Sequence, residues 1–291
     1  MNDTLIVTVY VVLDDLLRAM RHRTDCRAKT SDSEVLTVGV IAACQFANHH
    51  ERALCILRAL GYLSGPLSVS RFNRRFHALA HRLSDAIDLL AATLVAGTIF
   101  ILDSVPLPVC RRTGAVRCKK VRGADYCGYC AAKEEKFFGW RLHLVVTPQG
   151  MPVSFDLLPA SYHDLTPVHA LMERLPTGAT VYADKGYNSA DDEAWIEGET
   201  GIRLVPRRRK KMAPNTLAET FALQRYRGRI ETVNSQLAAW GCSGCTRGRT
   251  KGGCARCSPH SSPSSASTLT SNHGNMHRTY AVEPIGGERV E

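Results

Sequence analysis

The sequence predicts a mixed α/β protein: an all-α, helix-turn-helix-like region, then an α/β domain with a mixed sheet, then a disordered tail. Three observations predict it. Apolar residues recur at helical spacing through the first third of the chain, whereas short apolar runs bounded by turn residues begin near Gly97. Beyond Trp240 the apolar periodicity ends, and Gly, Ser, Arg, Cys and Pro dominate. The domain boundaries that we expect are residues 1–95, 96–241 and 242–291.

The composition favours a polyanionic partner. The formal net charge of the 291 residues is +10, which indicates nucleic acid before an anionic membrane surface. A membrane role is not expected, because the longest apolar runs, which start at Leu5 and Val35, have about half of the roughly 20 residues that a spanning helix needs. The first residues lack the basic region and cleavage site of a signal peptide. We therefore expect an intracellular, cytoplasmic protein whose 11 cysteines are reduced thiols or metal ligands.

The first 94 residues predict a series of helices. Three apolar-periodic stretches begin at Leu5, Ser31 and Glu51, and Ser31 with Glu34 forms a capping-box start. A fourth stretch, VSRFNRRFHALAHRL, follows the turn signal SGPLS and carries one apolar stripe: Phe72, Phe76, Leu79 and Leu83. Basic side chains are expected around the rest of its surface: Arg71, Arg74, Arg75, His77 and Arg82.

A short helix, a glycine-containing turn and a second, basic helix make a helix-turn-helix arrangement. The second helix can enter the major groove of DNA, where Arg71, Arg74 and Arg75 would meet phosphates and base edges. The alternative is an amphipathic helix with a basic solvated face. The pattern leaves both open, and we take DNA contact as the working hypothesis.

From Gly97 the period of the apolar residues changes. A buried strand, GTIFILDSVPL, precedes the segments FFGWRLHLVVT (Phe137–Thr147) and MPVSFDLLPA (Met151–Ala160), which Pro-Gln-Gly joins as a hairpin. A helix with Asp164 as its N-cap follows, then the strand ATVYADKGYNS, a helix, the strand IRLVP and a long helix ending in AAW. Three strands in a meander, followed by alternating helices and strands, predict a mixed sheet.

Two of the buried strands end in an aspartate, Asp103 in FILDS and Asp184 in VYADKGY, and packing explains neither acid. If the strands are neighbours, both carboxylates emerge at one edge of the sheet, where they would repel each other unless a divalent cation bridged them. A third acid, Glu231, lies on the long helix, with Arg227 and Asn234 one turn away on either side. Such a trio suits two Mg²⁺ or Mn²⁺ ions and an in-line phosphoryl displacement. Taken singly, each acid is more simply a turn, cap or surface residue.

The segments FILDS, FFGWRLHLVV, YADKGYNS and RYRGRIETVNSQL resemble bacterial insertion-sequence transposases of the DDE class, in the residues that flank each acid as well as in the acids. The spacings agree, with 81 residues from Asp103 to Asp184 and 47 from there to Glu231. The resemblance covers residues 1–241. It implies an RNase H-like catalytic domain in which these three acids bind the two metal ions.

The same resemblance implies further residues and partners. Tyr226 and Arg227 belong to the Y…R…E signature of the helix, whereas the basic residue that many relatives place seven positions after the glutamate is Ala238 here. The implied partners are a second copy of the chain, in a homodimer, and double-stranded DNA, both as the terminal inverted repeats of the element and as target DNA. The implied activity is cleavage at the ends of the element and joining of the 3′-hydroxyl to target DNA, without a covalent enzyme intermediate. Such a protein would associate with the nucleoid when bound to DNA.

Further basic residues near the acids are candidate phosphate contacts. Lys185 directly follows Asp184, although an ordinary surface lysine explains it equally well. The run RRRKK could hold the DNA backbone, although such a run is usually a solvated loop: Arg207, Arg208, Arg209, Lys210 and Lys211. His163 and Asp164 could form an accessory acid–base pair, but a helix cap beside a surface histidine explains them more simply.

Two groups of cysteines raise the question of zinc. The first group lies among basic residues with irregular spacing: Cys110, Cys118, Cys127 and Cys130. A basic DNA-contacting loop explains that segment better than a metal site does. The second group forms two CxxC pairs in the tail: Cys242/Cys245 and Cys254/Cys257. The sequence TRGRTKGG between these pairs lacks the strand-like residues of a zinc ribbon, so zinc is not expected there either.

We interpret the tail as an out-of-frame translation. With one choice of codons, a shift of one base turns Cys-Ser-Gly-Cys-Thr-Arg, from Cys242, into Leu-Gln-Arg-Leu-His-Ala, which would continue an amphipathic helix as similar transposases do. The chain would then lack the end of the helix that carries Glu231. Two alternative functions stay open: a catalytically inactive helix-turn-helix remnant or repressor of the element, and a zinc-ribbon nucleic-acid protein.

Overall fold

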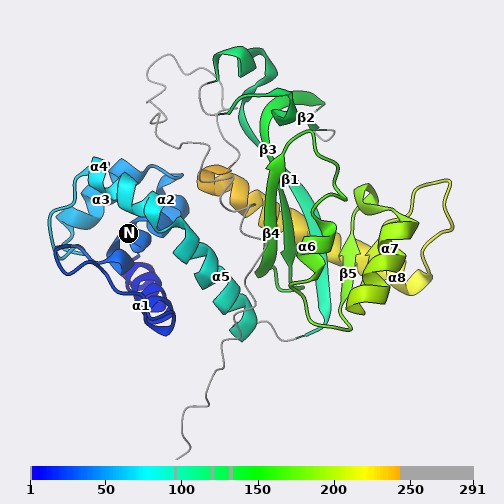
Figure 1. Cartoon of the computed structure of the whole chain (residues 1–291), viewed down its shortest axis with the longest axis horizontal. Helices are drawn as coiled ribbons and strands as arrows, with labels where there is room; N and C mark the ends of the chain where they lie inside the picture. Colours follow the sequence, from blue (N-terminus) through cyan, green and yellow to red (C-terminus); the bar gives the residue numbers. More distant parts are fainter. Residues whose placement is uncertain (1, 95–96, 119–120, 131–133, 243–291) are drawn as a thin grey trace, which may run out of the picture.

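The computed structural model describes residues 2–94, 97–118, 121–130 and 134–242, so the tail interpreted as out of frame lies outside the described residues from position 243 on. Figure 1 shows the two predicted parts, a cluster of N-terminal helices and a sheet with its own helices, with α5 between them. No helix in these four segments is long and apolar enough to cross a membrane. The predicted combination of an all-α region and a mixed α/β domain is confirmed.

The N-terminal region contains α1 (Asp3–Ala19), α2 (Asp32–Phe46), α3 (His50–Ala59), α4 (Val69–Ala78) and α5 (Ala80–Leu94). Helix α2 is its centre, because it is buried along most of its length and packs against α1, α3 and α4. Its predicted capping box is present, since the Ser31 hydroxyl accepts from the Glu34 N–H and the Glu34 carboxylate accepts from the Ser31 N–H. Glu34 also accepts from the N–H and the hydroxyl of Ser64, which ties the connection before α4 to the start of α2.

The basic segment after SGPLS forms two helices, α4 and α5, rather than one. Its apolar stripe packs into the helical core as predicted, with Phe72 buried and stacked on Phe76 at 5.5 Å between ring centroids. The connection between α3 and α4, residues 60–68, is longer than the turn of about 3–4 residues in a helix-turn-helix motif. The order of the helices therefore agrees with the prediction, but the turn does not.

Arg75 does not lie on the open surface where we expected it. Its guanidinium donates to Asp32 Oδ1 at 2.6 Å and to a backbone carbonyl of the loop before α2, whereas Arg71 and Arg74 are exposed as predicted. Burial disfavours the Asp32 carboxylate, but hydrogen bonds from Arg75 and His22 hold its pKa below the usual range. Arg75 is thus drawn inward because a half-buried carboxylate at the start of α2 needs a cation.

The sheet contains β1 (Ile99–Arg111), β2 (Cys127–Cys130), β3 (Glu135–Val146), β4 (Pro152–Pro159), β5 (Thr180–Ala183) and β6 (Arg203–Pro206). Strands β1, β5 and β6 are parallel neighbours, and β3 is antiparallel to β1 on the other side. The outer edge of β3 is shared, since β2 pairs with its first residues and β4 with the rest. The order β4-β3-β1-β5-β6 makes the mixed sheet that the sequence predicts.

Two elements differ from the prediction. Strand β1 does not end at Asp103, as predicted, but continues to Arg111, because it pairs with β3 along most of its length. Asp164 is not a helix cap: α6 (Val168–Met172) starts later without a side-chain cap, and Asp164 Oδ1 accepts from Arg141 Nη1 at 3.0 Å. The other elements are α7 (Ala190–Thr200), α8 (Leu217–Leu237), the short helices η1 (Arg112–Arg117), η2 (Ala124–Tyr126) and η4 (Lys185–Tyr187), and the π-helical turn η5 (Ala238–Cys242).

Each face of the sheet has its own apolar core, and the alternation of side chains along β1 decides which residues belong to which. One core joins the sheet to α6 and α7 and includes Phe100, Leu102, Leu171 and Ile196. The other joins the sheet to α8 and includes Ile101, Leu144, Ile230 and Val233. Helix α8 crosses its face of the sheet, and its continuation η5 reaches α2 (Figure 1). Because side chains alternate, Asp103 follows Ile101 on the α8 face.

Gly39 lets α2 approach the Phe76 ring of α4, because a Cβ at this position would lie 2.1 Å from Phe76 Cε2. We expect Gly39→Ala to lower the free energy of unfolding by about 1–3 kcal/mol through overpacking. Gly198, inside α7, is the matched control, since a Cβ there meets nothing within 4 Å and Gly198→Ala should stabilise by about 0.5–1 kcal/mol. Denaturant unfolding of both variants checks this, and a stabilising Gly39→Ala would contradict the close contact.

Candidate active site

Asp103 and Asp184 meet because β1 and β5 are parallel neighbours. Leu102 lies opposite Ala183 in the register, so the next residue along each chain segment is one of the acids. Both acids line a cavity of about 600 Å³ together with Glu231, which α8 brings to it. The structure thus gathers the three predicted acids around one hollow: Asp103 from inside β1, Asp184 from the end of β5 and Glu231 from α8.

Asp103 is the buried member of the trio. Its Oδ1 accepts from the Ser104 N–H at 2.8 Å, and its Oδ2 accepts from Asn234 Nδ2 of α8 at 2.9 Å. Burial raises the pKa of Asp103 to about 6; these two hydrogen bonds oppose the shift, and the charges of Asp184 and Asp164 add to it. Asp103 is therefore a carboxylate that the fold holds in place at an electrostatic cost.

Glu231 is more exposed and already paired. Its Oε1 accepts from Arg227 Nε at 2.8 Å, and both side chains are more than half exposed. This pair raises the pKa of Arg227, to which Asp184 and Asp103 also contribute. In the part of the chain that the structure describes, no three acid, histidine or cysteine side chains lie close enough together to hold one metal ion. Glu231 shares the cavity with the two aspartates without joining them at a common point.

The atoms around Asp103 nevertheless suit a divalent cation. The Oδ1 atom of Asn234 is buried and has no hydrogen-bond partner among the described residues, although Nδ2 of the same amide binds Asp103. An unpaired amide oxygen beside two mutually repelling carboxylates is a set of oxygen ligands that Mg²⁺ and Mn²⁺ prefer. Glu231 could complete the set after leaving Arg227. An exposed ion pair four residues apart on a helix is worth only about 0.3–0.5 kcal/mol, so this release costs little.

A second polar cluster lies behind Asp103, on the opposite face of the sheet. His143 Nδ1 is 3.0 Å from the Tyr187 hydroxyl, and both residues are buried. Burial lowers the pKa of His143 to about 4, so its ring is neutral at physiological pH. Arg141, on the same face of β3, holds Asp164. The sequence gives one signal for this cluster: Arg141 and His143 alternate with apolar residues inside a buried strand.

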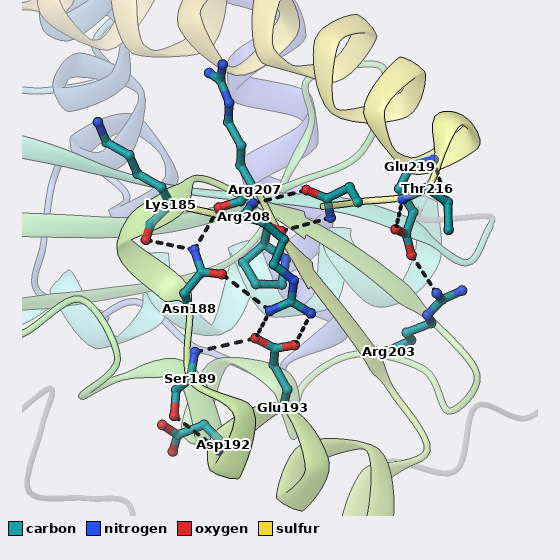
Figure 2. Close-up of polar contacts among 12 residues, drawn as sticks. Lys185, Asn188, Ser189, Asp192, Glu193, Arg203, Arg207, Arg208, Thr216 and Glu219 are labelled. Carbon is teal, nitrogen blue, oxygen red and sulfur yellow. Dashed lines mark hydrogen bonds and ion pairs between the residues drawn. The ribbon is translucent and has the colours of Figure 1, made fainter. Parts of the chain in front are cut away.

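Figure 2 shows that the basic run after β6 is tied to the turn after β5. Arg208 donates both Nη1 and Nη2 to the Glu193 carboxylate at 2.7 Å, so this residue of the run, which we predicted as a DNA contact, already has a carboxylate partner. Asn188 donates to the backbone carbonyls of Lys185 and Arg207 and accepts from Arg208 Nη1. Sequence reasoning missed Asn188 and Glu193, because only the fold brings them to the basic run.

The other predicted basic residues remain accessible. Exposed side chains are found at Lys185, Arg207, Arg209, Lys210 and Lys211. Arg209 also donates from Nε to the Lys185 carbonyl at 3.3 Å. Tyr226 packs against Tyr182 of β5, with ring centroids 5.3 Å apart, and lines the cavity beside Arg227. A basic rim therefore surrounds an acidic floor.

The first group of cysteines lies on β1, at the end of η1 and on β2. Over residues 97–118, 121–130 and 134–242, no group of three potential ligands gathers. Cys127 and Cys130 instead begin and end β2, an element that the sequence did not predict. In the tail, Cys245, Cys254 and Cys257 lie outside the described residues, so the question of a zinc ribbon there stays as the sequence left it.

Comparisons with known proteins find similarity to transposases. Residues 96–250 match the family described as Transposase DDE domain. The transposase for insertion sequence element IS1106 of Neisseria meningitidis serogroup B is 39% identical over 59 residues, and this alignment spans 20% of this chain and 20% of that relative. The solved structure of a piggyBac transposase synaptic complex with hairpin DNA is also similar, at 11% identity and a TM-score of 0.37. The alignment covers 75% of this chain and 52% of the piggyBac chain. Because the family match spans more than half of its residues, the chain belongs to the Transposase DDE domain family.

Proposed function

We propose that the chain is a DNA transposase that binds the ends of its own insertion sequence and carries out metal-dependent strand cleavage and strand transfer. The observation that carries this proposal is the meeting of Asp103 and Asp184 where the parallel pairing of β1 with β5 ends, with Glu231 at the same cavity. Family membership supports the reaction class. The basic rim supports a polyanionic substrate.

The residues that would hold Mg²⁺ or Mn²⁺ are Asp103, Asp184 and Glu231, with the Asn234 amide oxygen beside them. When bound, two such ions would supply positive charge to the attacking and leaving oxygens of an in-line displacement. The chain contributes the positioning. Asn234 and the Ser104 N–H fix the orientation of the Asp103 carboxylate. Arg227, once Glu231 leaves it, would be free to meet the DNA phosphate.

Substrate binding would use cations on two parts of the chain. Around the cavity these are Lys185, Arg207, Arg209, Lys210 and Lys211, which would hold phosphates of the element end and of target DNA. On α4, Arg71 and Arg74 remain proposed contacts for the terminal repeats, whereas Arg75 is occupied by Asp32. We propose a homodimer in the DNA complex, since two element ends must be held together.

A second candidate is a catalytically inactive DNA-binding remnant or repressor of the element. Two observations favour it: Glu231 is ion-paired with Arg227, and the sequence after Cys242 lacks the apolar spacing of the helical continuation expected of such transposases. Strand cleavage separates the two candidates, because both bind DNA.

The direct test of the enzyme is cleavage of supercoiled DNA that carries the element ends. With Mg²⁺ or Mn²⁺ present, we expect Asp103→Asn, Asp184→Asn and Glu231→Gln each to reduce nicking by at least about 10³-fold, because each removes a metal ligand while keeping the side-chain shape. DNA binding should persist in all three. If a variant still nicks DNA at near the parent rate, the substituted residue is not a metal ligand. If the parent chain binds DNA but never nicks it, the result supports the inactive repressor.

The metal-free chain should show the cost of the buried Asp103 carboxylate. The folded pKa is raised from 3.8 to about 6, so the folded state holds this proton more tightly and stability falls as pH rises through that interval. At pH 7 in EDTA, Asp103→Asn should raise the free energy of unfolding by about 3 kcal/mol. Below pH 3.8 the gain should vanish, because the parent carboxyl is then neutral in both states. Denaturation at both pH values measures this, and an equal effect at both would contradict it.

The basic run should divide into two functional classes. Replacing Arg209, Lys210 and Lys211 by Ala should weaken binding to any DNA and reduce the salt slope by about 0.9 per lost phosphate contact. Arg208→Ala also removes one positive charge, but it breaks the ion pair with Glu193. Its main effect should therefore be to lower the free energy of unfolding, by about 1–3 kcal/mol. Salt titrations of binding and denaturant unfolding test both. If Arg208→Ala is as stable as the parent and has a reduced salt slope, Arg208 contacts DNA rather than fixing the loop.

A further inference from the structure

Two large apolar side chains on α8 are largely exposed: Leu217 at 81% and Phe221 at 70% of their surface. The same helix buries Ile230 and Val233 against the sheet, so its apolar residues divide between a covered and an uncovered face. Leu217 and Phe221 are four residues apart and therefore lie on one face. Single exposed apolar residues need no explanation, whereas an aligned pair beside a functional cavity does.

Leu217 and Phe221 do not line the cavity that holds the acids, but their neighbours on α8 do. Phe221 directly follows Thr220 and lies one turn before Gln224, and both of these residues line the cavity. Met212, itself 36% exposed, lines the cavity from the loop before α8. Apolar side chains thus reach the rim of this cavity from the helix and from the loop.

The surroundings of the pair are positively charged. Exposed cations are present at Arg207, Arg209, Lys210, Lys211 and Arg225. Glu219, the acid in the first turn of α8, does not offset them, because it accepts from the Thr216 N–H and pairs with Arg203, with 16% of its side chain exposed. A second copy of the chain meeting this face about a two-fold axis would bring like charges together.

Apolar and aromatic groups among cations complement single-stranded nucleic acid. Aromatic rings stack on unpaired bases of any sequence, while the cations contact the phosphates. We propose that Phe221 forms a stacking contact for unpaired nucleobases at the rim of the cleavage cavity, with Leu217 beside it as an apolar contact. This inference rests on the proposed function, since it requires DNA strands to enter that cavity. It adds a base-contacting surface to a site whose other residues act on phosphates.

The test compares two DNAs in EDTA, where no strand is cut: a blunt duplex, and the same duplex with a short single-stranded tail. Fluorescence anisotropy gives the affinity of the full chain for each. Phe221→Ala should weaken binding to the tailed DNA by about tenfold and to the blunt duplex by less than about twofold, because only the tail offers bases for stacking. Phe221→Trp should retain the preference for the tail, and the tail should quench the new indole fluorescence.

Two controls make the result specific. Phe221→Leu keeps an apolar side chain but should lose most of the preference, since it cannot stack. Val7→Ala, an exposed apolar residue of α1, should change neither affinity. Equal losses on both DNAs, full retention by Phe221→Leu, or a dimeric parent that becomes monomeric in Phe221→Ala by light scattering would each overturn the stacking contact. A parent that binds neither DNA overturns the proposed function, and this inference with it.

Discussion

The parallel pairing of β1 with β5 is the constraint on which the rest of the site depends. It fixes Leu102 opposite Ala183, so that the acids that follow them meet where this parallel pairing ends. Apolar cores on both faces would tolerate many registers for Phe100 to Leu102, but not for Asp103. A slip of one residue in β1 would turn this carboxylate into the core under α6 and α7, away from the Asn234 amide. The acid that the site needs therefore also selects the register that builds it.

Carboxylate–arginine pairs are the second organising feature, and they define which cations remain for a substrate. Arg75 is held by Asp32, Arg208 by Glu193 and Arg227 by Glu231. The first two pairs are half-buried and join elements that are distant in sequence, so they belong to the fold. The third is exposed and lies within one helix, so it can exchange partners at little cost. Three arginines that look alike in the sequence thus have different roles.

Much of the architecture could be predicted from local patterns. The capping box at Ser31, the stripe around Phe72 and the hairpin after Val146 each depend on residues close together in the chain, and all are present. What failed depends on distant partners. Asp164 resembles a helix cap until β3 brings Arg141 to it, and the length of β1 follows from its pairing with β3. The meeting of Asp103 and Asp184 could be predicted only on the condition that their strands are neighbours, because the sequence of a strand does not specify which strand pairs with it.

The same reasoning explains why a net charge of +10 is a weak guide to the DNA-binding surface. A cation counts toward binding only if the fold leaves it exposed and without a carboxylate partner. By that measure the charges divide along the run after β6: Arg208 points back to Glu193 and fixes the loop, and its neighbours Arg207, Arg209 and Lys210 stay exposed beside the acids. Fixing the loop through one arginine costs a charge, but it lets the remaining cations face the cavity in a defined position. The basic rim and the acidic floor carry opposite charges and attract each other, and the contacts of Asn188 and Glu193 tie the basic run to the turn after β5 instead.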